Sequence, residues 1–182
     1  QQVSSAASDV YKRQNLMSKY EIDHRIPNAL IDGILSDLSK VNIKDYNQLF
    51  CYSYKVAGTV GLMMCDIMGV KENSLKFNAI YLGIAMQLTN ISRDVKEDLL
   101  RDRIYIPKEI RVHVKNDLNE IPLSDKLQRE FSKDLKKLID TSDIIYDLAW
   151  EGIIKLPLKY RFPIAIALSL IHISEPTRHT RI

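Results

Sequence analysis

The chain has 182 residues, of which 46% are hydrophobic and 27% are charged, and its formal net charge is +3 at pH 7. This size and balance are typical of one soluble globular domain, and they argue against a disordered chain or a pair of domains. The segments 1–14 and 169–182 each carry one net positive charge. The small charge left for the middle therefore gives no reason to expect a nucleic-acid partner, and we predict none.

The two ends of the chain differ in character from its middle. Residues 3–14 and 169–178 resemble the translated adapter sequence that often flanks genes from metagenomic assemblies. We therefore predict a non-native tail at 1–14, a partial domain at 15–168 and a second non-native tail at 169–182. On this interpretation the natural protein continues beyond both ends, whereas the alternative is a pair of ordinary disordered termini.

Between these ends the apolar residues recur at helical spacing, with no alternating strand pattern and no internal repeat, which predicts an all-α fold. A first helix is predicted to start near Asn28, a suitable N-cap after Pro27. Its buried side is expected to carry Leu30, Ile31, Ile34, Leu35 and Leu38.

A second helix is predicted from Asp45 to Gly69, where glycine suits a helix end. It contains Gly58 and Gly61, and each interior glycine costs roughly 0.5–1 kcal/mol relative to alanine. Close helix contact, a kink or room for a ligand would justify that cost. Cys51 and Cys65 lie too far apart along this helix to bridge, so we expect reduced thiols of the cytoplasmic type.

A third helix is predicted from Ser74 to Leu100, and it carries two faces. The first is an ordinary core face made of Phe77, Ile80, Tyr81, Ile84, Leu88, Ile91, Val95 and Leu99. A neighbouring polar face, which is expected to line a cavity or the solvent, is made of Gly83, Gln87, Asn90, Asp94 and Asp98.

The rest of the chain is also predicted to be helical. Residues 101–107 are expected to form a loop, with Pro107 at the start of a short helix. A long helix then begins after the N-cap Ser124 and ends near Gly152, and a last apolar helix begins near Phe162. The apolar side of the long helix comprises Leu127, Phe131, Leu135, Leu138, Ile145 and Ala149.

The most informative feature is the spacing of Asn90, Asp94 and Asp98, which are four residues apart and therefore share one helix face. Two like-charged carboxylates in one row are unfavourable unless a cation lies between them. A hard cation such as Mg²⁺, which prefers oxygen ligands and often bridges carboxylates to phosphates, satisfies that requirement. The alternative is a solvated acidic surface.

Arg93, Arg101 and Arg103 lie close to this acidic row. Guanidinium groups on one side and a metal on the other would suit a diphosphate. The alternative is that these arginines pair with neighbouring carboxylates on the helix surface.

Other residues give weaker signals. Tyr52 and Tyr54 precede the two glycines, although tyrosine on a half-buried helix is more often a packing residue. His24 and His113 lack metal-ligand spacing and support no zinc site. The longest apolar run, residues 162–173, is shorter than the ~18 residues of a membrane span.

Three segments together resemble the squalene/phytoene synthase family, and most of all its bacterial phytoene synthase branch. They are residues 52–61 (YSYKVAGTVG), 87–98 (QLTNISRDVKED) and 103–107 (RIYIP), and the resemblance extends over about residues 19–168. Motifs in this order and at this spacing are highly specific.

The resemblance implies an isoprenoid synthase-type helical bundle, incomplete in this chain, whose cavity holds two prenyl diphosphates. It implies a prenyltransferase of carotenoid biosynthesis that joins two geranylgeranyl diphosphates head to head, through a cyclopropylcarbinyl diphosphate, to give phytoene. The implied cofactor is Mg²⁺, with Mn²⁺ as the alternative. The implied location is cytoplasmic, with peripheral membrane contact suggested by the apolar substrates.

The resemblance also assigns roles to individual residues. The implied metal ligands are Asn90, Asp94 and Asp98. The implied catalytic residues are Tyr54, which would face the reacting carbons, and Arg93, Asp94 and Asp98. The implied substrate-binding residues are Gln87, Arg93, Gly58, Gly61, Arg103 and Tyr105.

The chain departs from the family pattern in two ways. Ser92 and Lys96 stand where the family more often has an apolar residue and a glycine, and we expect Lys96 to face solvent. The first aspartate-rich motif of the family does not precede Asn28, and the last helices are missing too. We therefore expect the 182-residue chain alone to be inactive.

Two alternative functions follow from the same resemblance. One is a squalene or dehydrosqualene synthase that uses farnesyl diphosphate. The other is a non-catalytic assembly factor with the same fold. The intact set Asn90, Arg93, Asp94 and Asp98 argues against the assembly factor, because a scaffold has no need for a row of like charges.

Overall fold

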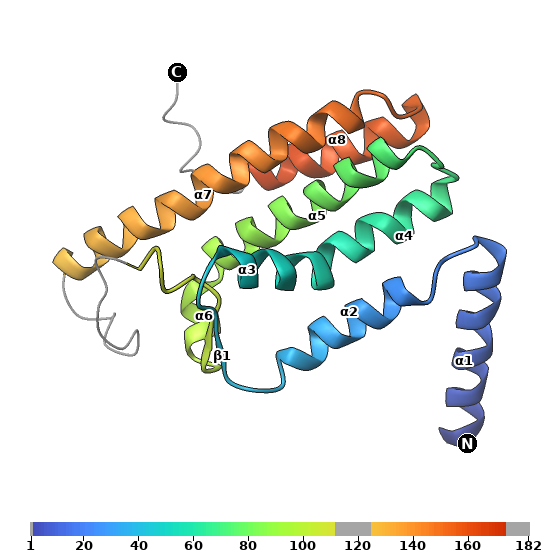
Figure 1. The fold of residues 1–182 in the computed structure, drawn as a ribbon, viewed down its shortest axis with the longest axis horizontal. Coiled ribbons are helices and arrows are strands. Elements are labelled where there is room, and N and C mark those ends of the chain that lie inside the picture. Colours follow the sequence, from blue (N-terminus) through green and yellow to red (C-terminus); the bar gives the residue numbers. More distant parts are fainter. Residues whose placement is uncertain (1, 112–124, 174–182) are drawn as a thin grey trace.

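The computed structural model describes the backbone of residues 2–111 and 125–173, and the side chains of residues 8–111 and 132–169. Helices make up most of these ranges (Figure 1), which confirms the predicted all-α class. The elements in chain order are α1 (Gln2–Lys19), α2 (Arg25–Ser36), β1 (Val41–Asn42), α3 (Tyr46–Ser53), the π-helical turn η1 (Tyr54–Gly58), α4 (Thr59–Met68), α5 (Asn73–Arg93), α6 (Val95–Leu99), β2 (Arg103–Ile104), α7 (Asp125–Ile153) and α8 (Leu158–Ile173).

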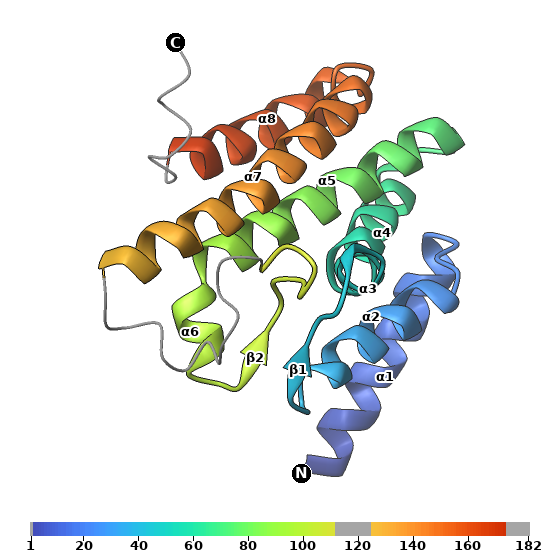
Figure 2. The same cartoon turned by 60° about the vertical axis from the view of Figure 1, so that its left-hand side comes forward.

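Helix α5 lies at the centre of the bundle. It packs against α7 on one side and against the continuous run α3–η1–α4 on the other (Figures 1 and 2). Helix α2 covers the outer side of η1 and α4, while α8 runs beside α7. Helix α1 projects away from the bundle (Figure 1). The prediction that residues 1–14 and 169–182 are non-native stays a prediction.

The first predicted helix forms, but its orientation was predicted wrongly. Helix α2 begins at Arg25, before the expected N-cap Asn28. Its buried residue is Gly33, whose backbone approaches Lys55 and Val56 of η1 so closely that a Cβ atom would lie 2.8 Å from each side chain. The predicted core residues on the opposite side are exposed, namely Ile31, Ile34, Leu35 and Leu38.

The second predicted helix is confirmed at both ends. The side chain of Asp45 accepts a hydrogen bond from the backbone N–H of Gln48 at 2.8 Å, and Gly69 ends the helix in the left-handed conformation. The unpredicted feature is η1, in which the N–H of Thr59 bonds to the carbonyl of Tyr54, five residues back. The hydroxyl of Thr59 donates to the carbonyl of Lys55 at 2.7 Å.

Close helix contact explains the glycines in this crossing. A Cβ atom at Gly61 would overlap the carbonyl of Ala79 in α5, 2.8 Å from its carbon. In the same way, a Cβ atom at Gly83 of α5 would lie 2.6 Å from the carbonyl carbon of Ala57. Helices without side chains at the contact can bring their backbones together, so α5 crosses η1 and α4 at very short range.

The third predicted helix bends at Asp94, which lies between α5 and α6 with φ −95° and ψ 14°. Ile84, Leu88 and Ile91 are buried as predicted. Phe77 and Tyr81 were predicted wrongly, since their side chains are 59% and 37% exposed. The glycine-lined crossing brings α4 against a different side of the first half of α5 and leaves these two rings facing outward.

Residues 103–104 form a short strand rather than the predicted loop. Strand β2 pairs in parallel with β1, in the register Val41 with Arg103. The N–H groups of Lys108 and Glu109 bond to the carbonyls of residues 43 and 44. Residues 108–110 therefore make a turn instead of the short helix expected after Pro107.

The last two helices largely follow the prediction. Leu138 and Ala149 of α7 are buried, with Leu135 and Ile145 partly buried. Ser124, and the side chains of residues 127 and 131, lie outside the described residues. Helix α7 ends at Ile153, and α8 begins at Leu158, four residues before the predicted Phe162.

Cys51 is exposed and Cys65 is buried, and both are free thiols as predicted. Within the described ranges, the helices are too short or too polar to cross a membrane.

The glycine crossing makes a stability prediction. Gly83→Ala is expected to lower the free energy of unfolding by about 2–3 kcal/mol, because the new methyl group would meet the backbone of Ala57. Urea denaturation measures this, with the exposed helical position Asn47→Ala as the control. A loss no greater than that of the control would contradict the close crossing.

Candidate functional site

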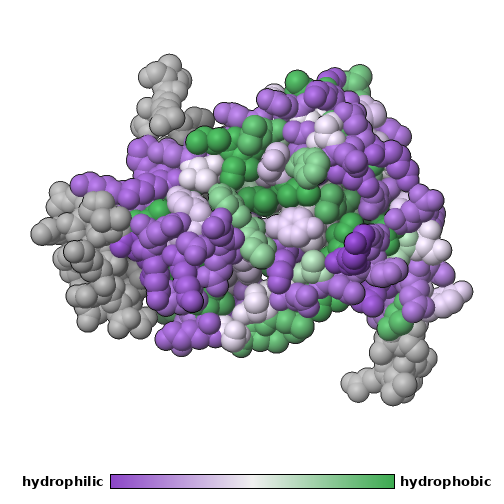
Figure 3. Space-filling model, viewed as in Figure 1, coloured by the Kyte–Doolittle hydropathy of each residue, from purple (hydrophilic) through white to green (hydrophobic). Residues whose placement is uncertain are grey.

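An elongated cavity of about 310 Å³ lies between α4, α5, the end of α7 and α8. Apolar side chains gather over this region of the surface (Figure 3). Its walls are mostly aliphatic or sulfur-containing and include Val60, Met64, Cys65, Met68, Leu75, Leu82, Met86, Ile153, Leu156 and Ile164. A cavity of this kind suits an apolar ligand with few hydrogen-bonding groups.

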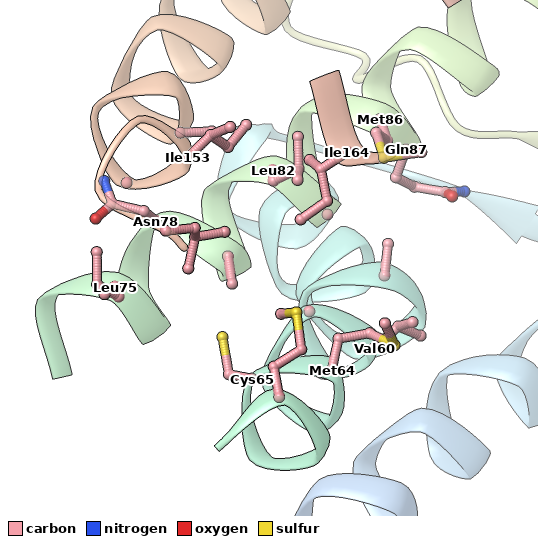
Figure 4. Close-up of a pocket in the computed structure, with 18 of the residues that line it drawn as sticks. Val60, Met64, Cys65, Leu75, Asn78, Leu82, Met86, Gln87, Ile153 and Ile164 are labelled. Atoms are coloured by element: carbon pink, nitrogen blue, oxygen red, sulfur yellow. The ribbon is translucent and has the colours of Figure 1, made fainter. Parts of the chain in front are cut away.

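The cavity has polar groups at one end. Gln87 and Asn90, one turn apart on α5, line it together with Gly61 and Gly83. Figure 4 shows Gln87 on one side of the cavity and Leu75 and Asn78 on the other. The structure therefore brings together three residues of the predicted site, Gly61, Gln87 and Asn90.

The other predicted site residues do not line this cavity, and among them Tyr54 and Gly58 fill each other's space. The ring of Tyr54 packs over Gly58, where a Cβ atom would lie 3.0 Å from the ring carbon Cδ2. Tyr54 packs against the core cluster that contains Leu49 and Leu88. The space at Gly58 is thus filled by Tyr54 and by Ile80 of α5.

The acidic row continues from the polar end of the cavity. The N–H of Asp94 bonds to the carbonyl of Asn90 at 2.8 Å, and the N–H of Asp98 bonds to the carbonyl of Asp94 at 2.9 Å. Helical hydrogen bonding therefore links all three residues in spite of the bend. The exposed Lys96 lies outside this row, as expected.

Arg93 and Asp94 form a two-pronged ion pair. The Nε atom of Arg93 lies 2.7 Å from Oδ1, and a terminal nitrogen lies 2.8 Å from Oδ2. The hydrogen bonds from Arg93 lower the pKa of the Asp94 carboxyl group, although burial opposes the shift. This carboxylate is therefore ionised and partly neutralised in the absence of any ligand.

Asp98 has the opposite electrostatic character. Burial raises the pKa of its carboxyl group, and the negative charges of Asp94 and Asp37 raise it further, while Arg103 and Arg101 oppose the shift. Asp98 lines a small cleft with Arg103 and Tyr105. Such crowding of carboxyl groups is relieved by a cation.

The structure adds Asp37 and Tyr52 to the predicted site residue Tyr105. The hydroxyl groups of Tyr52 and Tyr105 donate to the two carboxylate oxygens of Asp37, at 2.9 and 2.7 Å. The two rings stack with centroids 4.9 Å apart. Asp37 and Tyr52 were visible in the sequence, but their meeting depends on β1 and β2, which bring residues 41 and 103 together.

Burial raises the pKa values of both phenols, and the carboxylate of Asp37 adds to this effect. The pKa of Tyr105 reaches about 12. Both hydroxyl groups therefore stay protonated in the ordinary pH range and act as hydrogen-bond donors. The negative charge of Asp37 contributes to the raised pKa of Asp98, and Tyr105 lines the same small cleft as Asp98.

The oxygen donors of Asn90, Asp94 and Asp98 are of the type that Mg²⁺ prefers. Within the described ranges no three His, Cys, Asp or Glu side chains are arranged to hold a metal ion. The donor set nevertheless fits a metal by its chemistry, because it combines an amide oxygen with two carboxyl groups. In addition, the positive charges of Arg103 and Arg101 do not offset the effects that raise the pKa of Asp98.

Comparison with known proteins identifies relatives of this chain. Phytoene synthase from Narcissus pseudonarcissus is 35% identical over 166 residues, covering 85% of this chain and 38% of that protein. Phytoene synthase 2 from Solanum lycopersicum is 34% identical over 166 residues, covering 85% of this chain and 51% of that protein. Both are described as chloroplastic. The chain thus spans about two-fifths to one-half of the length of these relatives.

A solved structure shares the fold. Squalene synthase HpnC from Alicyclobacillus acidocaldarius superposes with a TM-score of 0.67 at 18% identity, over 87% of this chain and 62% of that chain. The family model described as squalene/phytoene synthase matches residues 5–172. With this match, and with relatives that share a third of its residues, the chain belongs to the squalene/phytoene synthase family.

Proposed function

We propose that the protein joins two molecules of geranylgeranyl diphosphate head to head, through a cyclopropylcarbinyl diphosphate, to form phytoene. One observation carries this proposal: an apolar cavity ends at Gln87 and Asn90, on the helix that continues into Arg93 and Asp94. A prenyl diphosphate has the same division into a long apolar chain and a charged head. The phytoene synthases among the relatives support geranylgeranyl diphosphate as the substrate.

The polar end would bind the diphosphate. The amides of Gln87 and Asn90 offer neutral hydrogen-bond donors, and the guanidinium group of Arg93 offers charged ones. Arg93 donates two hydrogen bonds to the carboxylate of Asp94. Binding of the substrate diphosphate to Arg93 would therefore have to break this ion pair. Arg103, beside Asp98 in the small cleft, would add a further positive charge.

Asn90, Asp94 and Asp98 would hold Mg²⁺, or Mn²⁺ in its place. The bound metal would supply positive charge to a departing diphosphate. The apolar walls would exclude water from the carbocation that remains, which water would otherwise quench. Tyr52 and Tyr105 would keep their protons on the phenol oxygens throughout, because burial raises the pKa values of both hydroxyl groups.

Tyr54 has a different role in this proposal from the one that the resemblance implies. Its ring covers Gly58 and contributes to the core beside Leu88. It would therefore support η1, whereas Tyr52 and Tyr105 are the phenols that meet a carboxylate. Since the substrate carries a long apolar chain and the product is a hydrocarbon, we include peripheral contact with a membrane and a cytoplasmic location in the proposal.

The proposed role of Asp94 can be tested in the protein expressed from its gene at its natural length. With Mg²⁺ and geranylgeranyl diphosphate we expect phytoene, identified by mass. Asp94→Ala is expected to lower the rate at least about 100-fold, since it removes charge stabilisation at the leaving group. The exposed neighbour Glu97→Gln is the control and is expected to keep the activity.

Other outcomes would redirect the proposal. A shorter hydrocarbon made from farnesyl diphosphate would favour a squalene or dehydrosqualene synthase. A folded protein that yields no product from either substrate would contradict an enzymatic role. The 182-residue chain alone is expected to give no product, and activity from it would contradict that part of the prediction.

The phenols around Asp37 make a prediction about pH. The folded protein holds the proton of Tyr105 up to a pKa of about 12, whereas an unfolded tyrosine releases its proton near pH 10. The resulting stabilisation is present below about pH 10 and is lost as the pH rises toward 12. Asp37→Asn is expected to lower the pKa of Tyr105, because it removes a nearby negative charge.

Phenolate absorbance during an alkaline titration measures this pKa. Tyr105→Phe identifies which step belongs to Tyr105, and Asp32→Asn on the exposed side of α2 is the matched control. An Asp37→Asn variant in which Tyr105 titrates as in the control would contradict the cluster.

A further inference from the structure

The two ends of the cavity differ in chemistry. Gln87 and Asn90 form the polar end, whereas Cys65, Leu75 and Asn78 lie at the other. Along α5, a rise of 1.5 Å per residue places Asn78 about 18 Å from Asn90. Figure 4 shows Leu75 and Asn78 together on the side of the cavity opposite Gln87.

Asn78 is held in place from two directions. Its side-chain nitrogen donates a hydrogen bond to the carbonyl of Leu148 in α7 at 2.6 Å. Its side chain rests on Gly152, where a Cβ atom would lie 2.6 Å from the Cγ atom of Asn78. Asn78 therefore cannot move toward α7, and moving toward the cavity would break its hydrogen bond.

Asn78 is partly buried, so the hydrogen bond of its amide offsets part of the cost of placing a polar side chain in a mostly apolar wall. Here the side-chain nitrogen of Asn78 bonds to the carbonyl of Leu148 and so joins α5 to α7. This nitrogen therefore needs no hydrogen bond from a ligand. Leu75 lies one turn before Asn78 on the same helix and lines the same end of the cavity. A fixed amide and a leucine side chain thus line this end of the cavity together.

We propose that Asn78, held by Leu148 and seated on Gly152, forms with Leu75 the end wall that limits the length of the apolar chain this cavity accepts. The inference rests on the proposed function, because it takes the diphosphate to lie at the end formed by Gln87 and Asn90. It goes further by assigning the selection between shorter and longer prenyl chains to two residues of α5.

The test uses the protein expressed at its natural length, with Mg²⁺ and three stable probes. These are the geranyl, farnesyl and geranylgeranyl thiolodiphosphates, in which sulfur replaces the bridging oxygen. Calorimetry gives the affinity of each probe without requiring catalysis. The quantity of interest is the affinity for the geranylgeranyl probe divided by that for the farnesyl probe.

Asn78→Ala removes part of the wall and is expected to raise this ratio about four- to tenfold, since each further buried methylene is worth a factor of about four. Leu75→Phe extends the wall and is expected to lower the ratio by a similar factor. Phe77→Ala, an exposed position on the same helix, is the control and is expected to leave the ratio unchanged.

The outcomes separate the inference from the proposed function. Equal changes in all three affinities would mean that Asn78 only joins α5 to α7, and would overturn the inference while leaving the function. Should Asn78→Ala fail to fold, the opposite shifts expected for Leu75→Phe and Leu75→Ala decide the question. A wild-type protein that binds none of the probes would overturn the proposed function and the inference with it.

Discussion

The structure depends on one close approach of helix backbones, at the crossing of α5 with η1 and α4. Gly61 faces the carbonyl of Ala79, and Gly83 faces the carbonyl of Ala57, with no side chain between the helices. A contact this short costs the conformational entropy of two interior glycines. In return it fixes the distance between the two helices that supply most of the cavity walls, so the shape of the cavity follows from this crossing.

The charges around Asp98 show how a site can hold unfavourable electrostatics in a stable fold. Asp94 is compensated by Arg93, and Asp37 by two phenol hydroxyl groups. Asp98 is compensated less well, since burial and neighbouring carboxylates outweigh the arginines nearby. The surrounding core, which includes the buried Leu88, Ile91 and Ile106, supplies the stability that permits such a local imbalance.

Local chemistry made much of this fold predictable. The cap at Asp45, the left-handed Gly69 and the four-residue spacing of Asn90, Asp94 and Asp98 are each decided within a few residues. Nonlocal contacts were not predictable in this way. The apolar side of α2 was assigned to the core, although Gly33 faces the bundle. The contact of Asp37 with Tyr105 spans 68 residues of sequence. It depends on the pairing of β1 with β2, and strands of two residues are too short to give a recognisable sequence pattern.

The π-helical turn at Tyr54–Gly58 has a consequence for how the long helix is used. A turn that closes over five residues instead of four contains one extra residue, and this rotates everything after it by about 100° relative to a regular helix. Residues before the turn, such as Tyr52, can therefore face Asp37, while Val60 and Met64 after it face the cavity. One continuous helical run thus contributes side chains both to the cluster at Asp37 and to the cavity wall. The extra residue of the π-helical turn supplies the rotation between these two sets of side chains.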